Sequence, residues 1–141
     1  MQDNSPHVKI TEIILGCCFD VINELGAGFL EAVYKNALMI AMLEKGLKVE
    51  CEKRFNVMFR GKKIGLYIAD LIVNDSVIIE LKCQEQLLSE NQAQLINYLK
   101  ASGVDVGLLV NFGKSKLEYR RLYHPRYSPF AIPSLKYSHS A

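Results

Sequence analysis

The chain has 141 residues, of which half are apolar and 23% are charged, and its formal net charge is +2. This is one domain's worth of sequence, and the composition excludes intrinsic disorder for most of it. No apolar run approaches the roughly 20 residues that cross a bilayer, and the N-terminus lacks the pattern of a signal peptide, so we expect a cytoplasmic protein without membrane spans.

The cysteines do not have the spacing of a metal site. Cys17, Cys18, Cys51 and Cys83 form no CxxC pair and have no nearby pair of histidines. Zinc sites and iron–sulfur clusters usually show such spacings, so neither is indicated. We expect free and mostly buried thiols.

The first half of the chain predicts two helices and then strands. Apolar residues recur every three or four positions from Val8 to Leu25 and again from about Leu30 to Lys45, which places them on one face of a helix. Between Lys48 and Lys82 the period changes to two, with turn residues at 60–63 and 74–76. That pattern is typical of strands joined by tight turns. We therefore expect two antiparallel helices followed by a three-stranded meander.

The second half predicts a helix and two further strands. Helical spacing returns at Ser89, which fits a capping box with Gln92, and continues to about Ala101. The continuous apolar run Val106–Phe112 is typical of a buried strand, and the helix before it favours a parallel pairing. Residues 116–123 fit an edge strand.

These elements fit a single α/β domain. Their order, ααβββαββ, predicts a central mixed β-sheet flanked by helices over residues 1–124. Three prolines follow over residues 125–141, so we expect that segment to be irregular. No internal repeat divides the chain.

Three charged residues stand out on the second and third predicted strands. Alternation places Glu80 and Lys82 on one face, and the turn at 74–76 brings Asp70 onto the paired strand within reach of Glu80. Asp70 shares its expected face with apolar residues, namely Ile64, Leu66, Ile68 and Ile72. The plainer interpretation is a surface ion pair on an edge, with Asp70 opening a turn.

A divalent cation would explain two adjacent carboxylates. Like charges repel unless a cation lies between them, and oxygen ligands without histidine or thiolate favour Mg²⁺ or Mn²⁺. A neighbouring lysine can polarise a phosphate or help to activate a water. Phosphodiester hydrolysis uses this combination of groups.

The pattern resembles a known nuclease superfamily. An Asp, a hairpin and then Glu-x-Lys, here Asp70 and Glu80-Leu81-Lys82, resemble the PD-(D/E)xK core. Gln94 to Tyr98 is similar to the QxxxY motif of its RecB-type branch, and Gly28 to Tyr34 is similar to the motif that names the GxxExxY family. The resemblance covers about Ile10 to Phe112 and implies a restriction-endonuclease-like fold.

The resemblance also implies roles for single residues. Asp70 and Glu80 would hold Mg²⁺ or Mn²⁺ together with the Leu81 carbonyl, Lys82 would be the catalytic lysine, and Glu31 would complete the metal site. The alternative for Glu31 is a first-turn acid favoured by the helix dipole.

Substrate contacts are predicted on two helices and in the basic C-terminal part. Gln94 and Tyr98 share a helix face, from which they could contact the substrate backbone. Tyr34 is expected either to contact substrate or to belong to the core. Residues 113–141 carry 6 Lys/Arg against 1 Asp/Glu, whereas residues 1–112 carry 11 against 14. Basic residues with interleaved tyrosines suit contact with nucleic acid, and Arg120 and Arg121 are the predicted substrate contacts among them. A basic edge strand that avoids aggregation explains these residues equally well.

The function expected is metal-dependent hydrolysis of DNA, with RNA the weaker candidate. A homodimer fits this expectation, because small nucleases of this kind often need two sites to cut two strands. The competing hypothesis is a module that binds nucleic acid or protein without catalysis.

Overall fold

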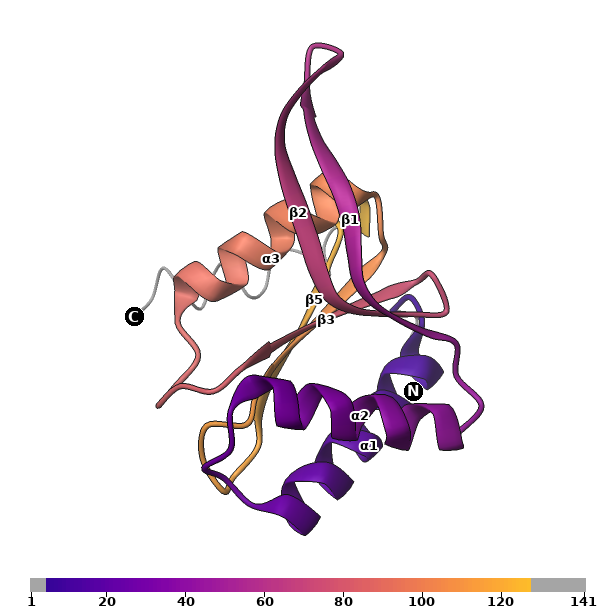
Figure 1. Cartoon of the computed structure of the whole chain (residues 1–141). Coiled ribbons are helices and arrows are strands. Elements are labelled where there is room, and N and C mark those ends of the chain that lie inside the picture. The colour runs from indigo at the N-terminus through magenta and orange to yellow at the C-terminus, as the bar shows by residue number, and fades with distance from the viewer. Residues whose placement is uncertain (1–4, 128–141) are drawn as a thin grey trace.

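The computed structural model describes residues 5–127 and confirms the predicted order of elements. Figure 1 shows them along the chain. Their bounds are α1 Val8–Leu25, α2 Glu31–Glu44, β1 Val49–Phe59, β2 Lys62–Val73, β3 Val77–Lys82, α3 Ser89–Ser102, β4 Val106–Asn111 and β5 Glu118–Tyr123.

The strands form a five-stranded mixed sheet in the order β1-β2-β3-β4-β5. The first three strands pair antiparallel, as the meander predicted. β4 is parallel to β3 and antiparallel to β5. The parallel pair arises because α3 crosses over between β3 and β4, so that β4 returns in the direction of β3.

Helices cover both faces of the sheet, as Figure 1 shows. On one face α1 and α2 bury the side chains of Leu71, Ile79 and Leu108. On the other face α3 packs over Ile72, Ile78 and Leu109 with its own residues Leu95, Ile96 and Leu99. The continuous apolar sequence of β3 and β4 follows from this burial on both sides.

One expectation about β2 is wrong. Ile64, Leu66 and Ile68 are exposed, whereas their alternation partners Tyr67 and Ala69 are buried under α3. Ile72, and not Leu71, continues that buried face, so the alternation slips by one residue at Asp70. In β1, Glu52 lies opposite Asp70 with a φ of 54°, which breaks the regular pleat at this level. α3 therefore covers the side of β2 that carries Tyr67, Ala69 and Ile72, and not the side that carries Ile64, Leu66 and Ile68.

The predicted start of α3 needs a smaller correction. Leu88 is the N-cap residue, and its N–H donates to Asn91 Oδ1 at 2.9 Å. Ser89 is therefore the first helical residue, and the predicted box of Ser89 with Gln92 does not form. Gly103 ends the helix in the left-handed conformation with a φ of 75°, as expected.

Pro125–Tyr127 form a short 3-10 helix, and the rest of the predicted irregular segment 125–141 lies outside the described residues. All four cysteines are free, with Cys17 and Cys18 buried. Among the helices of residues 5–127, none is long and apolar enough to cross a membrane.

Candidate active site

Asp70 and Glu80 lie together where β2 and β3 separate. The β2–β3 ladder ends with the pair Leu71 and Ile79. Beyond it, the Asp70 N–H donates to Glu80 Oε2 at 3.2 Å, and the Leu81 N–H donates to Asp70 Oδ2 at 3.0 Å. Each carboxylate thus takes the place of a missing backbone partner and keeps its second oxygen free of hydrogen bonds from the described residues.

Glu80 lies in an environment that disfavours its ionised form. It is 9% exposed. Burial, together with the nearby charge of Asp70, raises its pKa to about 7, although the Tyr67 hydroxyl, the Asp70 N–H and the Lys82 charge act in the opposite direction. The Tyr67 hydroxyl donates to Glu80 Oε2 at 2.6 Å. A buried carboxylate with a raised pKa beside a second carboxylate forms a site that a cation would stabilise.

Aromatic rings connect this pair to α3. Tyr98 stacks on Tyr67 with ring centroids 3.7 Å apart, and Phe55 also stacks on Tyr67, with ring centroids 6.0 Å apart. Burial and the Glu80 charge raise the pKa of Tyr98, and hydrogen bonding with Gln94 partly offsets the rise. Gln94 and Tyr98 therefore share a helix face as predicted, and they reach Glu80 through Tyr67. Sequence reasoning missed Tyr67, whose signal was its place among the alternating residues of β2.

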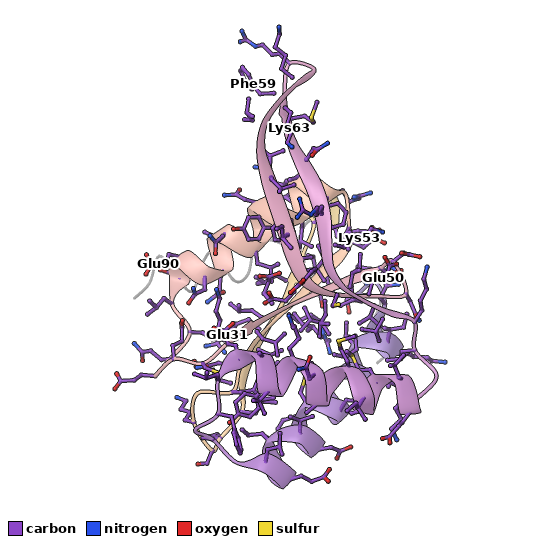
Figure 2. All side chains as sticks on the ribbon, viewed as in Figure 1. Glu31, Glu50, Lys53, Phe59, Lys63 and Glu90 are labelled. Atoms are coloured by element: carbon purple, nitrogen blue, oxygen red, sulfur yellow. The ribbon has the colours of Figure 1, made fainter. Side chains whose placement is uncertain are left out.

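Glu31 and Asp70 line a common pocket of about 230 Å³, together with Ala32, Lys35 and Leu81. Glu31 is exposed in the first turn of α2, and Figure 2 labels it there. Lys35 forms an ion pair with Glu52 at 3.2 Å. Across residues 5–127, no three acidic, histidine or cysteine side chains are close enough to form a metal cluster. The structure therefore pairs Asp70 with Glu80 and with Glu31, but does not gather all three carboxylates at one point.

The corner before α2 explains the spacing of Gly28, Glu31 and Tyr34. Gly28 has a φ of 114°, which favours glycine. The Tyr34 hydroxyl donates to the Gly26 carbonyl at 2.6 Å and accepts from the Phe29 N–H at 3.1 Å. Tyr34 is completely buried. The predicted substrate contact at Tyr34 is thus corrected to a structural role, because its hydroxyl is used to fix the corner that presents Glu31.

A buried amide holds the loop between Lys82 and α3. Asn111 is fully buried, and its Oδ1 accepts from the N–H groups of Gln84 and Gly113 at 3.0 and 2.9 Å. Its Nδ2 donates to the Gln84 carbonyl at 2.9 Å and to Glu118 Oε1 at 3.1 Å. Glu118 Oε1 also accepts from the Leu87 N–H. Sequence reasoning missed this network, since a polar residue ending an apolar strand was its only signal.

Lys82 and the basic residues of β5 lie at different distances from the carboxylate pair. Lys82 is half-buried, and its charge lowers the pKa of Glu80. Arg120 and Arg121 are on β5, two strands from β3. Arg120 is exposed beside a hollow of about 520 Å³ that Lys114 and Lys116 also line. The two arginines are therefore not part of the pocket that contains Asp70.

Comparisons with known proteins match this chain to a protein family and to solved structures. The sequence model of the PD-(D/E)XK nuclease superfamily matches residues 8–122. The crystal structure of SSO0001 is similar at 17% identity and a TM-score of 0.44, covering 99% of this chain and 77% of that chain. The search of curated proteins finds no match. The family match includes the strands that carry Asp70 and Glu80.

Proposed function

The chain belongs to the PD-(D/E)XK nuclease superfamily, and on that premise we propose that it is a divalent-metal-dependent nuclease that hydrolyses phosphodiester bonds in DNA. The observation that carries the proposal is the reciprocal pair of Asp70 and Glu80 at the open end of β2 and β3. A purely structural pair of a buried and a half-buried carboxylate would destabilise the fold without a compensating cation.

The donor groups fit Mg²⁺ or Mn²⁺. They are carboxylate oxygens and a backbone carbonyl, and neither histidine nor cysteine is among the residues that line the pocket of Glu31 and Asp70; hard cations prefer such oxygens. Mg²⁺ commonly uses one or two carboxylates and keeps several waters. Asp70 and Glu80 would therefore suffice as direct ligands with the Leu81 carbonyl, while Glu31 would act from the opposite wall of the pocket.

Each residue then has a separate task. A bound divalent metal lowers the pKa of a coordinated water and stabilises charge on the phosphate. Lys82 would orient the attacking water and balance the negative charge of the pair. Tyr67 would hold Glu80 in place, and Gln94 and Tyr98 would support Tyr67 and contact the substrate backbone. Arg120 and Arg121 would bind more distant phosphates.

Within the superfamily we assign the chain to the GxxExxY family and the RecB-type branch. The support for this assignment is local. Gly28 and Tyr34 build the corner that presents Glu31 to the pocket, and Gln94 and Tyr98 face Tyr67 from α3. The same reasoning leaves residues 1–124 as the proposed catalytic domain.

The test combines metal binding with cleavage. Purified wild type, Asp70→Asn and Lys82→Ala are melted with and without Mg²⁺ or Mn²⁺ and incubated with single-stranded and duplex DNA. Metal that binds only the folded protein raises the melting temperature. We expect metal stabilisation in wild type and Lys82→Ala, and cleavage in wild type alone.

Asp20→Asn is the matched control, because Asp20 is an exposed acid on α1, on the outer side of the molecule. It should keep both the metal response and cleavage. If Asp70→Asn kept both the metal response and cleavage, the proposal would be contradicted. Salt-sensitive DNA binding in wild type, unchanged by chelator and without cleavage, would favour the non-catalytic binding module instead.

A further inference from the structure

The β1–β2 hairpin extends beyond the rest of the sheet as a two-stranded arm, which we define as residues 54–68. Figure 1 shows it projecting away from the helices. Residues 62–70 of β2 pair only with β1, because pairing with β3 begins at Leu71. A register shift between Val57 and Met58 adds a bulge near the tip. Such bulges increase strand twist and prevent edge-to-edge pairing with other sheets.

The arm has an unusual charge. It contains Arg54, Arg60, Lys62 and Lys63 and no acidic residue. All four are exposed, and none forms an ion pair with any carboxylate of residues 5–127. Lys53, just below the arm, differs because it lies within 4 Å of Glu50 and Asp75. The arm thus presents four uncompensated cations over a short length of chain.

One face of the arm is apolar and uncovered. α3 packs on the face that carries Tyr67, with Phe55 and Val57 partly buried beside it. The other face and the tip expose large apolar side chains that are 43% to 65% accessible, namely Met58, Phe59, Ile64, Leu66 and Ile68. Figure 2 shows Phe59 and Lys63 near the tip. Arg60 lies over the Phe59 ring at 4.8 Å, so cation and aromatic surface coincide there.

The position of the arm relates it to the carboxylate pair. β2 runs without interruption from Lys62 at the tip to Asp70 at the base. Eight strand steps of about 3.4 Å give a reach of about 27 Å, which is about eight base pairs of duplex. A polyanion lying along the arm would therefore be directed toward Asp70 and Glu80.

We propose that the arm binds the nucleic-acid duplex next to the cleavage site, with its four cations on phosphates and Phe59 against a base. This inference rests on the proposed nuclease function. A two-stranded ribbon fits a DNA groove, and apolar side chains from such ribbons can insert between base steps. A second copy of the chain fits less well, because joining two arms by the same face would bring four cations from each copy together.

The experiment measures binding apart from cleavage. A labelled duplex of about 20 base pairs is titrated with protein in EDTA by fluorescence anisotropy, over a range of salt concentrations. The arm variant is Lys62→Gln with Lys63→Gln. Its matched control is Lys9→Gln with Lys45→Gln, which removes two exposed lysines from the helical layer. The slope of log K against log salt should become shallower by about 1.8 in the arm variant and remain unchanged in the control.

Phe59→Ala tests the apolar contact. It should weaken binding about five-fold or more without changing the salt slope, since stacking carries no charge. Leu43→Ala removes a similarly exposed apolar side chain from α2 and should leave affinity unchanged. All these positions are exposed, so melting temperatures close to wild type are expected.

The outcomes separate this inference from the nuclease proposal. If wild type cleaves DNA, and the arm variants bind and cleave it as well as wild type does, the inference about the arm is wrong and the nuclease proposal stands. If wild type binds DNA through the arm but does not cleave it with Mg²⁺ or Mn²⁺, the inference about the arm is supported and the nuclease proposal is overturned. Arm variants that lose self-association in sedimentation while retaining DNA affinity would show a surface for a second copy, and the inference would be wrong.

Discussion

Asp70 and Glu80 each accept a hydrogen bond from the strand that carries the other. The Asp70 N–H bonds to Glu80 at 3.2 Å, and the N–H of Leu81, which follows Glu80, bonds to Asp70 at 3.0 Å. The arrangement fixes both carboxylates against the backbone before any ligand arrives.

Metal-free protein should lose stability as the pH rises through neutrality. The pKa of Glu80 is about 7 in the folded protein against 4.5 for an ordinary glutamate. The folded state therefore binds a proton that the unfolded state has released, so the stabilisation is complete below about pH 4.5 and is lost as the pH rises to about 7. The difference corresponds to at most about 3 kcal/mol. Urea unfolding in EDTA at about pH 5 and about pH 7.5 measures it.

Glu80→Gln provides the control, because the amide does not titrate and should remove most of this pH dependence. Adding Mg²⁺ at about pH 7.5 should restore the stability that the wild-type protein has lost, since a bound cation favours the ionised carboxylate. An equal loss of stability in wild type and Glu80→Gln would show that another group is responsible.

Tyr67→Phe should shift the pH dependence of the site while leaving the aromatic stack in place. The hydroxyl donates to Glu80 at 2.6 Å and lowers the pKa of Glu80, so its removal should raise that pKa further. The acid limb of a cleavage profile should then move to higher pH, and the stability loss in EDTA should move in the same direction. Tyr98→Phe keeps the hydroxyl of Tyr67 and should show neither shift; identical profiles for Tyr67→Phe and wild type would contradict this role.

The pairing of Asp70 with Glu80 could be predicted from the sequence, because a short turn and an alternating pattern are local features. The parallel β4 was predictable for the same reason, since a helix precedes an apolar run. The exposure of the apolar face of the arm could not be predicted from the sequence. Ile64, Leu66 and Ile68 have the pattern of a buried strand face, and only the slip at Asp70 opposite Glu52, with α3 on the other side, places them outside.

The support of the site was equally hidden, because it depends on contacts between distant positions. Asn111 bonds to Gln84 across 27 residues, and Glu118 bonds to Leu87 across 31. Nothing in the local pattern indicates which polar residue will meet which backbone group. For Tyr34 both interpretations were open in the sequence, and the bonds of its hydroxyl to the preceding corner decide for the structural one.

Gly113→Ala should destabilise the protein by about 1–3 kcal/mol or more. A Cβ at this position would overlap the backbone N and O of Gln84, which cannot move away as a side chain could. Gly65→Ala is the matched control, since its Cβ would meet only Val57 at an ordinary 3.7 Å. That change should be neutral or slightly stabilising, because it restricts the unfolded chain. Urea unfolding at neutral pH compares the two, and equal stabilities would contradict the close approach.

Asn111→Asp should destabilise the protein most strongly at neutral pH. The substitution keeps the oxygen that accepts from Gln84 and Gly113, but replaces the donating NH₂ by an oxygen that faces the Gln84 carbonyl and Glu118. Although burial alone would raise the pKa of Glu118, hydrogen bonds from Asn111 and the Leu87 N–H lower it overall. The new carboxylate would remove one of those donors and add a like charge, at a cost of about 3 kcal/mol.

The pH dependence of this loss separates its electrostatic part from simple packing. The introduced acid should have a folded pKa above its unfolded value of about 4, so its penalty should shrink as the pH falls from that raised pKa to about 4, where the protonated group can donate again. Asn111→Leu removes all four hydrogen bonds without adding charge, so its loss relative to wild type should depend far less on pH. Parallel pH profiles of unfolding free energy for the two variants would mean that the contact with Glu118 does not govern the stability of this loop.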